Sequence, residues 1–350
     1  MSLFSSSNHS YLGVDISAPS IKMVELTRNG SQVALLTYGF SEQMINSQPI
    51  DLTTLDVAKT SLLIKHIADK AHITSTFSLA SMPTASVFSS IININQTVNK
   101  KDLEAAINWE AKKVIPLPLQ DIVLDWQKIE TGTTGSNTIL LTGAPKALIQ
   151  NYISIFKSAQ FNLLSLETEI FALIRSLLGN DRSPVMMVQI GSTTTNIFVI
   201  DKSTPVLNRS IAVGGINITQ AIATHLNVSL EQAEQFKYDL MHTEIAPGQT
   251  AALPAMIIEA LSPIVNEIKY IFEVFGNNEG RHLEKIILTG GGALLPGLTN
   301  YLSDQFNINT IVGDPWFRIS YPFELKPILE KIGPRLAVAI GLAMREFDKK

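Results

Sequence analysis

The pattern of hydrophobic and polar positions repeats once along this chain. Residues 12–27 form an apolar segment, a polar turn at Ser17–Ser20 and a second apolar segment, and residues 185–200 have the same order. A further apolar segment follows each unit, at 31–40 and around 205–211. Short apolar runs joined by small polar residues are typical of paired strands, and self-similarity within a chain is typical of a duplicated fold. The pattern therefore predicts two related halves, each opening on strand–turn–strand.

Helical periodicity follows each of these units. In the first half, apolar residues spaced close to 3.6 predict a helix from Asp56 to Ala71, followed by a short strand at 77–80. In the second half, Ser229 and Gln232 form a weak capping box, and Lys285–Leu288 predicts a strand that leads into a glycine-rich turn. The helices expected there cover about 217–226, 229–240, 254–275 and 334–346.

The segment 85–160 has a different order of elements. A strand at 87–94 precedes a helix that Asn99 can cap and that ends before Pro116, because proline cannot continue a helix interior. The elements expected next are strands near 121–130 and 138–143 and a helix over 146–159. This order predicts a small β-α-β-β-α module inserted into the first half. Trp109 and Trp126 are expected to be packing residues at its seam, with a role at a partner surface as the alternative.

Composition excludes several classes of function. The chain has 350 residues, no cysteine, and 27 basic against 31 acidic residues. It therefore has no disulfide framework or thiolate metal site, and the charge balance argues against a nucleic-acid binder. The histidines show no paired spacing that would favour a metal site. The N-terminus does not resemble a signal peptide, and the apolar stretch Leu336–Met344 is far shorter than the roughly 20 residues of a membrane span. We expect a cytoplasmic protein without direct membrane insertion.

The first turn carries residues that suit a phosphate ligand. Asp15 ends the first strand and can hold Mg²⁺ through water, while Lys22 can reach a phosphate. Ser17 and Ser20 are small enough to let an anion approach the turn. The same pattern is equally that of a hairpin with an acidic edge and a solvated lysine.

Two further turns are candidates for ligand contact. Gly191–Asn196 is rich in hydroxyl side chains, although threonine is also an ordinary strand residue. Gly290–Gly292 separates a strand from a helix, where glycines let backbone approach a ligand or pack closely. No glycine-lysine-Ser/Thr sequence follows a glycine-rich loop, so a P-loop is excluded. A Rossmann site is not indicated either, because no strand leads into GxGxxG.

Together the three turns resemble those of the actin-like ATPase superfamily, in which two related halves face a nucleotide cleft. The chain resembles one family in particular, the PilM family of type IV pilus assembly proteins, from about residue 11 to 347. The stretches that carry the resemblance are LGVDISAPSIKMVEL, INWEAKKVIPLPLQDIVLDW, LSLETEIFALIRSL, VQIGSTTTNIFVI, GGINITQAI, KIILTGGGALLPGL and PRLAVAIGLAMR.

The resemblance implies an α/β fold of the duplicated, ribonuclease H-like actin type, with two lobes around the cleft and one inserted module. The expected subdomains are a first half (1A) of 1–84 with 161–184 and 334–350, the module (1C) of 85–160, a second half (2A) of 185–216 with 283–333, and a helical subdomain (2B) of 217–282.

The resemblance also implies a set of ATP-binding or ADP-binding residues. Asp15 corresponds to the aspartate that holds Mg²⁺ through water. Glu169 corresponds to the residue that positions the attacking water, although its position equally suits a carboxylate at a helix N-terminus. Glu234 and Lys237 correspond to ribose and adenine contacts, or form an exposed ion pair. The expected cofactor-binding residues are Asp15, Ser17, Ser20, Lys22, Gln189, Gly191, Ser192, Thr193, Thr194, Glu234, Lys237, Gly290, Gly291 and Gly292.

One position departs from the pattern of the superfamily. Gln189 stands where many actin-like ATPases have an aspartate, and an amide cannot supply the negative charge that holds a magnesium–water shell. Pro19 stiffens the first turn where a glycine is usual nearby. We expect nucleotide binding with slow or absent hydrolysis.

By resemblance, the chain is a scaffold that binds the cytoplasmic N-terminal tail of the membrane protein PilN beside the module. It would link other inner-membrane and motor components of the pilus at the inner membrane. One alternative is a filament-forming protein of the FtsA or MreB type, although the sequence stops at Lys350 without the amphipathic tail usual in FtsA. Another is a small-molecule kinase of the same superfamily, which needs an acceptor site.

Overall fold

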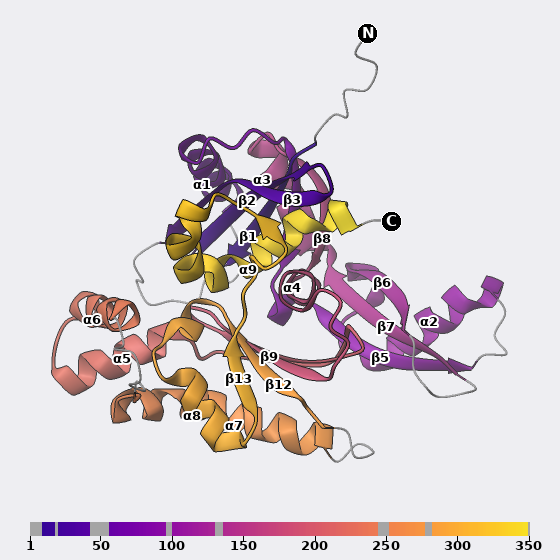
Figure 1. Ribbon diagram of the computed structural model, residues 1–350. Coiled ribbons are helices and arrows are strands. Elements are labelled where there is room, and N and C mark those ends of the chain that lie inside the picture. The colour runs from indigo at the N-terminus through magenta and orange to yellow at the C-terminus, as the bar shows by residue number, and fades with distance from the viewer. Residues whose placement is uncertain are drawn as a thin grey trace, which may run out of the picture.

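The structure is a computed structural model that describes residues 9–17, 20–42, 56–95, 100–129, 136–243, 252–276 and 282–348. Pro19 and Asn99, each given a role by the sequence, lie outside these ranges. The described residues form two large sheets, one above the other, and a smaller sheet at one side (Figure 1).

The first large sheet opens on three antiparallel strands. Asp15 on β1 (Tyr11–Ser17) is the register partner of Lys22 on β2 (Ser20–Asn29), and β2 pairs with β3 (Gln32–Glu42). The sheet is completed by β4 (Phe77–Met82), β8 (Asn162–Thr168) and β14 (Ile319–Ser320), in the order β14-β3-β2-β1-β4-β8. One face is covered by α1 (Val57–Lys70) and α3 (Lys146–Ser158), which share an apolar core with β1 and β2.

The second large sheet repeats this order. Its antiparallel strands are β9 (Val185–Ile190), β10 (Thr195–Asp201) and β11 (Thr204–Ile211), and β12 (Lys285–Thr289) and β13 (Asn309–Val312) add in parallel. The order β11-β10-β9-β12-β13 corresponds strand for strand to β3-β2-β1-β4-β8. The duplication expected from the hydrophobic pattern is therefore confirmed in the topology of the two sheets.

Four helices share an apolar core with the second sheet. They are α5 (Gly215–Leu226), α6 (Leu230–His242), α7 (Ala255–Gly276) and α8 (Leu298–Phe306). Ser229 caps α6 by accepting from the amide of Gln232, whose side chain accepts from the amide of Ser229, so the predicted capping box is present. Met186 on β9 is fully buried in the core beneath these helices.

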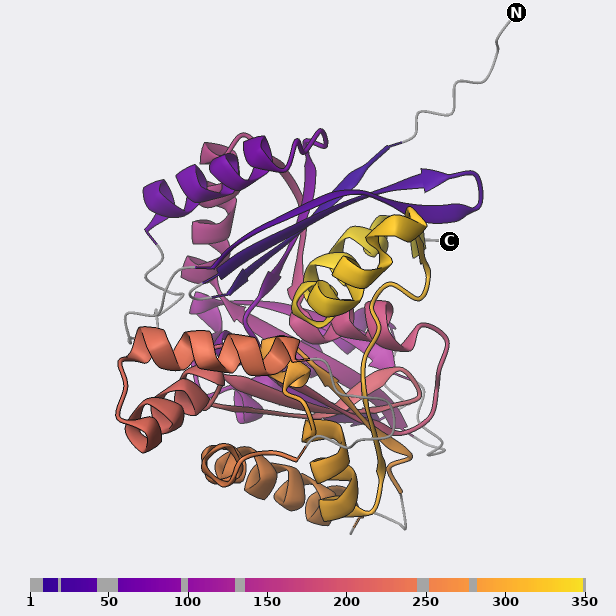
Figure 2. The ribbon, with the colours of Figure 1, turned by 60° about the vertical axis from the view of Figure 1, so that its left-hand side comes forward.

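Two helices fill the space between the large sheets. They are α4 (Glu169–Leu173), which continues as a π-helical turn over Ile174–Leu178, and α9 (Lys326–Asp348). Their apolar residues share a core with Leu79 of the first sheet and Met187 of the second. Figures 1 and 2 show α9 between the two sheets, and it packs mainly on β1 and β2 of the first sheet.

The smaller sheet forms the inserted module. It contains β5 (Phe88–Asn95), β6 (Ile122–Ile129) and β7 (Ser136–Pro145), with β7 in the centre, and α2 (Lys100–Val114) packs on one face. The helix expected to close this module, α3, packs instead with the first half and lies beside α1 (Figure 1). The exact subdomain boundaries stay a prediction.

Two further expectations need correction. Trp109 and Trp126 are not packing residues at a seam, because their exposed fractions are 60% and 37% and the inner face of the module is filled by smaller apolar side chains. The last helix begins at Lys326 and not at residue 334, so that Pro334 lies inside it. Proline is more typical of the first turn of a helix, so the sequence placed the helix start at Pro334 and missed the helical residues before it.

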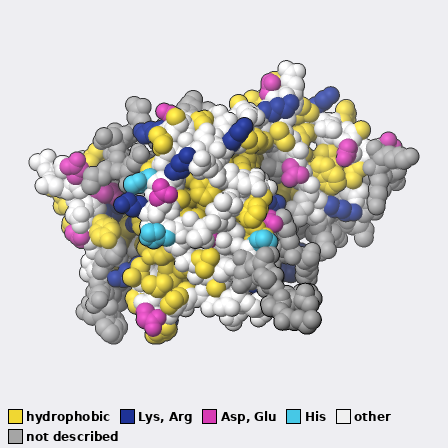
Figure 3. Space-filling model, turned by 90° about the horizontal axis from the view of Figure 1, so that it is seen from above, with side chains coloured by type: hydrophobic (Ala, Val, Ile, Leu, Met, Phe, Trp, Pro, Cys, Tyr) yellow, Lys and Arg dark blue, Asp and Glu magenta, His cyan; other side chains and the backbone are white. Residues whose placement is uncertain are grey.

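The distribution of surface charge and the character of the helices agree with the near-balanced charge and the short apolar stretches of the sequence. Basic and acidic side chains are interspersed on the face shown in Figure 3, and no single sign of charge dominates that face. Among the helices of the described ranges, none combines the length and apolar character needed to cross a bilayer.

Candidate functional site

A cavity of about 760 Å³ lies where the turns of the two large sheets face each other. It is lined by residues of β1, β2, α4, β9, α5, α6, α9 and the glycine turn after β12. Every site residue predicted from the sequence lies on its wall. These are Asp15, Ser17, Ser20, Lys22, Glu169, Gln189, Gly191, Ser192, Thr193, Thr194, Glu234, Lys237, Gly290, Gly291 and Gly292. The ligand contacts assigned to them stay predictions.

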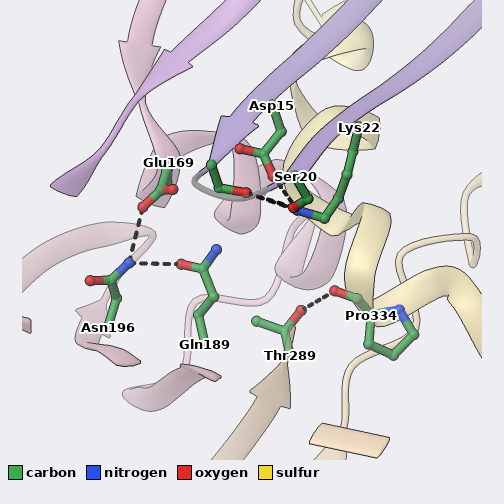
Figure 4. A network of polar contacts seen from close by, with 9 residues as sticks. Asp15, Ser20, Lys22, Glu169, Gln189, Asn196, Thr289 and Pro334 are labelled. Atoms are coloured by element: carbon green, nitrogen blue, oxygen red, sulfur yellow. Dashed lines mark hydrogen bonds and ion pairs between the residues drawn. The ribbon is translucent and has the colours of Figure 1, made fainter. Parts of the chain in front are cut away.

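The first turn holds an ordered lysine. The Nζ of Lys22 donates to the hydroxyls of Ser17 at 2.9 Å and Ser20 at 2.8 Å, and it lies 3.3 Å from Oδ2 of Asp15 (Figure 4). Only 14% of the Lys22 side chain is exposed, so it is not the solvated lysine of an ordinary hairpin. Its positive charge is held at the cavity wall before any ligand arrives.

The second turn is fixed to the start of α5. The carbonyl oxygens of Gly191 and Ser192 accept from the amides of Gly215 at 2.9 Å and Ile216 at 2.8 Å. A Cβ on Gly214 would lie 2.7 Å from the Gly191 oxygen, so only glycine permits this approach. The hydroxyl-rich turn is therefore held rigidly beside a helix N-terminus, an environment that favours anions.

The α6 pair lies at another wall of the cavity. The Nζ of Lys237 donates to Oε2 of Glu234 at 2.7 Å, to the hydroxyl of Thr219 at 2.7 Å and to the carbonyl of Gly215 at 3.1 Å. The lysine is buried while the glutamate is half exposed. Lys237 thus ties α6 to the N-terminus of α5, and the simple exposed ion pair considered from the sequence is wrong for the lysine.

The three glycines of the third turn have different reasons to be glycine. Gly290 has a φ of 80°, and a Cβ there would lie 2.4 Å from the backbone oxygen of Ile190. A Cβ on Gly292 would lie 2.3 Å from Cγ2 of the same isoleucine. At Gly291 the nearest atom would be Nε of Arg335 at 3.7 Å, so only this glycine has room on the cavity side. Close packing accounts for the two outer glycines.

The third turn is also bonded to α9. The carbonyl of Pro334 accepts from the amide of Gly290 at 2.9 Å and from the hydroxyl of Thr289 at 3.1 Å, as Figure 4 shows for Thr289. These bonds attach the helix between the lobes directly to the second sheet. Pro334 and Arg335 consequently form part of the cavity wall.

Among the groups that line the cavity, Glu169 has a strongly shifted pKa. Its Oε2 accepts from the Thr84 hydroxyl at 2.9 Å, the Thr84 amide at 3.4 Å and Nδ2 of Asn196 at 3.0 Å. Burial, and then repulsion from Asp15, raise its pKa from 4.5 to about 7 despite these hydrogen bonds. A carboxyl that exchanges its proton near neutral pH can act as a general acid or base.

Sequence reasoning missed Asn196. Its Nδ2 donates to Glu169 and, at 3.2 Å, to Oε1 of Gln189, so it joins the second sheet to α4 (Figure 4). The signal was a single amide side chain in an otherwise apolar strand, TNIFVI, but the adjacent threonines made it look like part of the turn.

The residues present fit a magnesium–water shell poorly. Oδ2 of Asp15 is paired with Lys22, and Oδ1 is enclosed without a protein partner. Within the described part of the chain, no group of three or more His, Asp or Glu residues is arranged to hold a metal ion. The described residues therefore offer no site of three direct protein ligands, and the role of Asp15 in holding Mg²⁺ through water stays a prediction.

A second, small cavity of about 40 Å³ lies beside the module. Its wall combines residues of β5 with residues of β11, which are edge strands of their sheets in the described structure. The wall is completed by Thr84, Val87, Leu140, Thr168, Ile170 and Phe171. It is therefore separated from the large cavity by the start of α4, where Glu169 lies.

The duplicated sheet order, with a cavity between the two halves at their hairpin turns, defines the actin-like ATPase fold. Comparison with solved structures agrees. The structure of a PilM-PilN type IV pilus biogenesis complex matches with a TM-score of 0.79 at 22% identity, covering 97% of this chain and 99% of that one. MreB5 of Spiroplasma citri bound to AMPPNP matches with a TM-score of 0.52 at 14% identity, covering 97% and 96%.

Sequence comparison narrows the class to a family. The family described as type IV pilus assembly protein PilM matches residues 13–347, and the chain belongs to this family. Its relatives include the cell division protein FtsA of Borreliella burgdorferi, 26% identical over 72% of this chain and 68% of that protein. FtsA of Bacillus subtilis is 24% identical over 63% of this chain and 58% of its own length. Membership of the family confirms the resemblance found in the sequence and assigns the chain to type IV pilus assembly.

Proposed function

We propose that the large cavity binds ATP or ADP and that the chain is a nucleotide-binding scaffold rather than a fast ATPase. The observation that carries the proposal is that residues from three distant turns and one helix line a single cavity of about 760 Å³. This volume is in the range of roughly 300–1,000 Å³ typical of small-molecule sites. Lys22 supplies a fixed positive charge, and the turn at Gly191 lies at a helix N-terminus.

The proposed roles follow from these positions. Lys22, Ser17 and Ser20 contact phosphate, as do Gly191–Thr194, while Gly290–Gly292, Glu234 and Lys237 lie toward the nucleoside. Glu169 is placed to hold or accept a proton near the phosphates. Hydrolysis is slow because Gln189 cannot polarise water as a carboxylate does.

Calorimetric titration with ATP and with ADP tests nucleotide binding. We expect Lys22→Ala to weaken binding at least about tenfold, because it removes a charge-assisted phosphate contact. Lys113→Ala is the matched control, since this lysine pairs with Glu110 on the module and is remote from the cavity wall. Failure of the unmodified protein to bind either nucleotide would contradict the proposal.

The same scaffold is proposed to bind the cytoplasmic N-terminal tail of PilN. The solved PilM-PilN complex contains a relative of this chain, and the strand edges beside the small cavity offer a place for an extended segment. Edge strands β5 and β11 border it, and such edges accept a further strand through main-chain hydrogen bonds. The protein would then be cytoplasmic and peripheral to the inner membrane through PilN, in contact with other pilus components.

The likeness to FtsA gives a second candidate function, a filament-forming protein. Nucleotide-dependent pelleting that rises steeply with protein concentration would support this candidate. A protein that stays in the supernatant with ATP at all concentrations would favour the scaffold.

A further inference from the structure

We propose that this cavity binds a nucleotide largely independently of Mg²⁺, because Gln189 presents hydrogen-bond donors to the phosphates where a metal–water shell needs acceptors. The inference rests on the proposed function and concerns the metal requirement of the site, which binds the nucleotide with or without Mg²⁺. It follows from a chain of hydrogen bonds that fixes the orientation of the Gln189 amide.

The chain of hydrogen bonds begins at a group that can only donate. The backbone amide of Thr84 donates to Oε2 of Glu169, so this oxygen is an acceptor. The Asn196 side chain donates to the same oxygen from its Nδ2 at 3.0 Å. That nitrogen also donates to Oε1 of Gln189 at 3.2 Å.

This chain of hydrogen bonds determines which atom of the Gln189 amide faces the cavity. With Oε1 occupied by Asn196, the other end of the Gln189 amide is the NH₂ group. Figure 4 shows this nitrogen pointing away from Asn196, toward the side of the cavity occupied by Asp15, Ser20 and Lys22. An amide nitrogen donates and cannot accept, so it suits a phosphate oxygen and opposes a water bound to a cation.

The carboxylate oxygens of Asp15 do not replace the acceptor that is missing at Gln189. Oδ2 of Asp15 is 3.3 Å from Lys22, and Oδ1 has no exposed surface from which to accept a hydrogen bond from a magnesium-bound water in the cavity. Phosphate charge is instead offset by the amine of Lys22, which is already held by two serine hydroxyls. The site thus has the donors that free phosphate needs.

Calorimetric titration with ADP in MgCl₂ and in EDTA tests the inference. For the unmodified protein we expect the two dissociation constants to agree within about threefold. In Gln189→Asp, a carboxylate replaces the donor, so we expect binding in EDTA to be at least about tenfold weaker than in MgCl₂. Gln189→Asn keeps an amide and serves as the control, with no new dependence on the metal.

The possible results are distinct. Binding of the unmodified protein that weakens about tenfold or more in EDTA would overturn the inference and leave the proposed function standing. Absence of binding in both conditions would overturn the proposed function and this inference with it. The unmodified protein alone decides whether binding is independent of Mg²⁺, so the inference can be tested even if a variant fails to fold.

Discussion

The hydroxyl of Thr84, on the wall of the small cavity beside the module, donates a 2.9 Å hydrogen bond to Oε2 of Glu169, on the wall of the large cavity. Both groups are buried, and the same oxygen accepts from Asn196 of the second sheet. A change in either cavity can therefore shift a group that forms the wall of the other. This contact is the physical basis of the coupling that we propose between a nucleotide in the large cavity and a partner beside the small one.

The first prediction concerns that coupling. In the unmodified protein we expect nucleotide to change the affinity for a PilN tail peptide by about fivefold or more. Thr84→Val keeps the shape but removes the hydroxyl, so the ratio of the two affinities should move toward one. Calorimetry with and without ADP measures it. Thr138→Val, which removes a hydroxyl bonded to Asn93 within the module, should leave the ratio unchanged. An equal ratio in both variants and the parent would refute the coupling.

The second prediction concerns pH. Burial and Asp15 raise the pKa of Glu169 from 4.5 to about 7, so the folded protein keeps a proton that the unfolded chain releases near 4.5. The free energy of unfolding should accordingly fall as pH rises from about 4.5 to about 7. Glu169→Gln cannot ionise and should remove this part of the pH dependence. Urea denaturation at a series of pH values measures the difference between the two proteins.

A control for the pH experiment is Asp181→Asn. Hydrogen bonds from Lys285 and then Ser183 lower the pKa of Asp181 to about 2. Both states of the protein have therefore lost this proton before the window opens, and the variant should follow the pH profile of the parent from about pH 5 to about pH 7. A constant stability difference between Glu169→Gln and the parent across that window would contradict the account.

The third prediction separates two neighbouring glycines. A Cβ at position 292 would lie 2.3 Å from Ile190, so Gly292→Ala should destabilise the protein by about 1–3 kcal/mol. At position 291 the nearest atom would be 3.7 Å away, so Gly291→Ala should leave stability nearly unchanged and weaken nucleotide binding by obstructing the cavity. Thermal unfolding and calorimetry measure the two effects. Unaltered affinity in Gly291→Ala would remove this turn from the nucleotide site.

The fourth prediction concerns the helix between the lobes. A Cβ on Gly341 of α9 would lie 1.9 Å from the backbone oxygen of Ala172 on α4. Gly341→Ala should therefore cost about 3 kcal/mol or more, measured by urea denaturation. A Cβ on Gly276, at the end of α7, would meet no atom of the described residues within 4 Å, and Gly276→Ala should change stability by no more than about 0.5 kcal/mol. Equal stability of the two variants would contradict the close packing of α9.

Much of this architecture was predictable because its causes are local. The alternation of apolar segments and small polar turns predicted both three-stranded units. The turns alone fitted ordinary hairpins equally well, and the family resemblance implied that they line one cavity. The capping box at Ser229 is likewise a local signal. Where neighbouring residues determine the structure, the sequence was sufficient.

The rest depends on contacts between residues far apart in the chain. Gly290 and Gly292 are fixed by Ile190, and α3 joins the first half through apolar contacts with β1 and β2. Asn196 acquires its role only because Glu169 and Gln189 lie on either side of it. Hydrophobic periodicity carries no information on such contacts. The exposure of Trp109 likewise depends on which face of α2 packs on the module's sheet.

The central claim is that one chain holds a nucleotide and a pilus partner at two coupled sites. Calorimetric titration with a synthetic peptide of the PilN N-terminal tail, with and without a saturating nucleotide, tests it most directly. The account predicts peptide binding in which nucleotide changes the dissociation constant. Absence of peptide binding in both conditions would contradict the scaffold function, and equal affinities in both would contradict the coupling through Glu169 and Thr84.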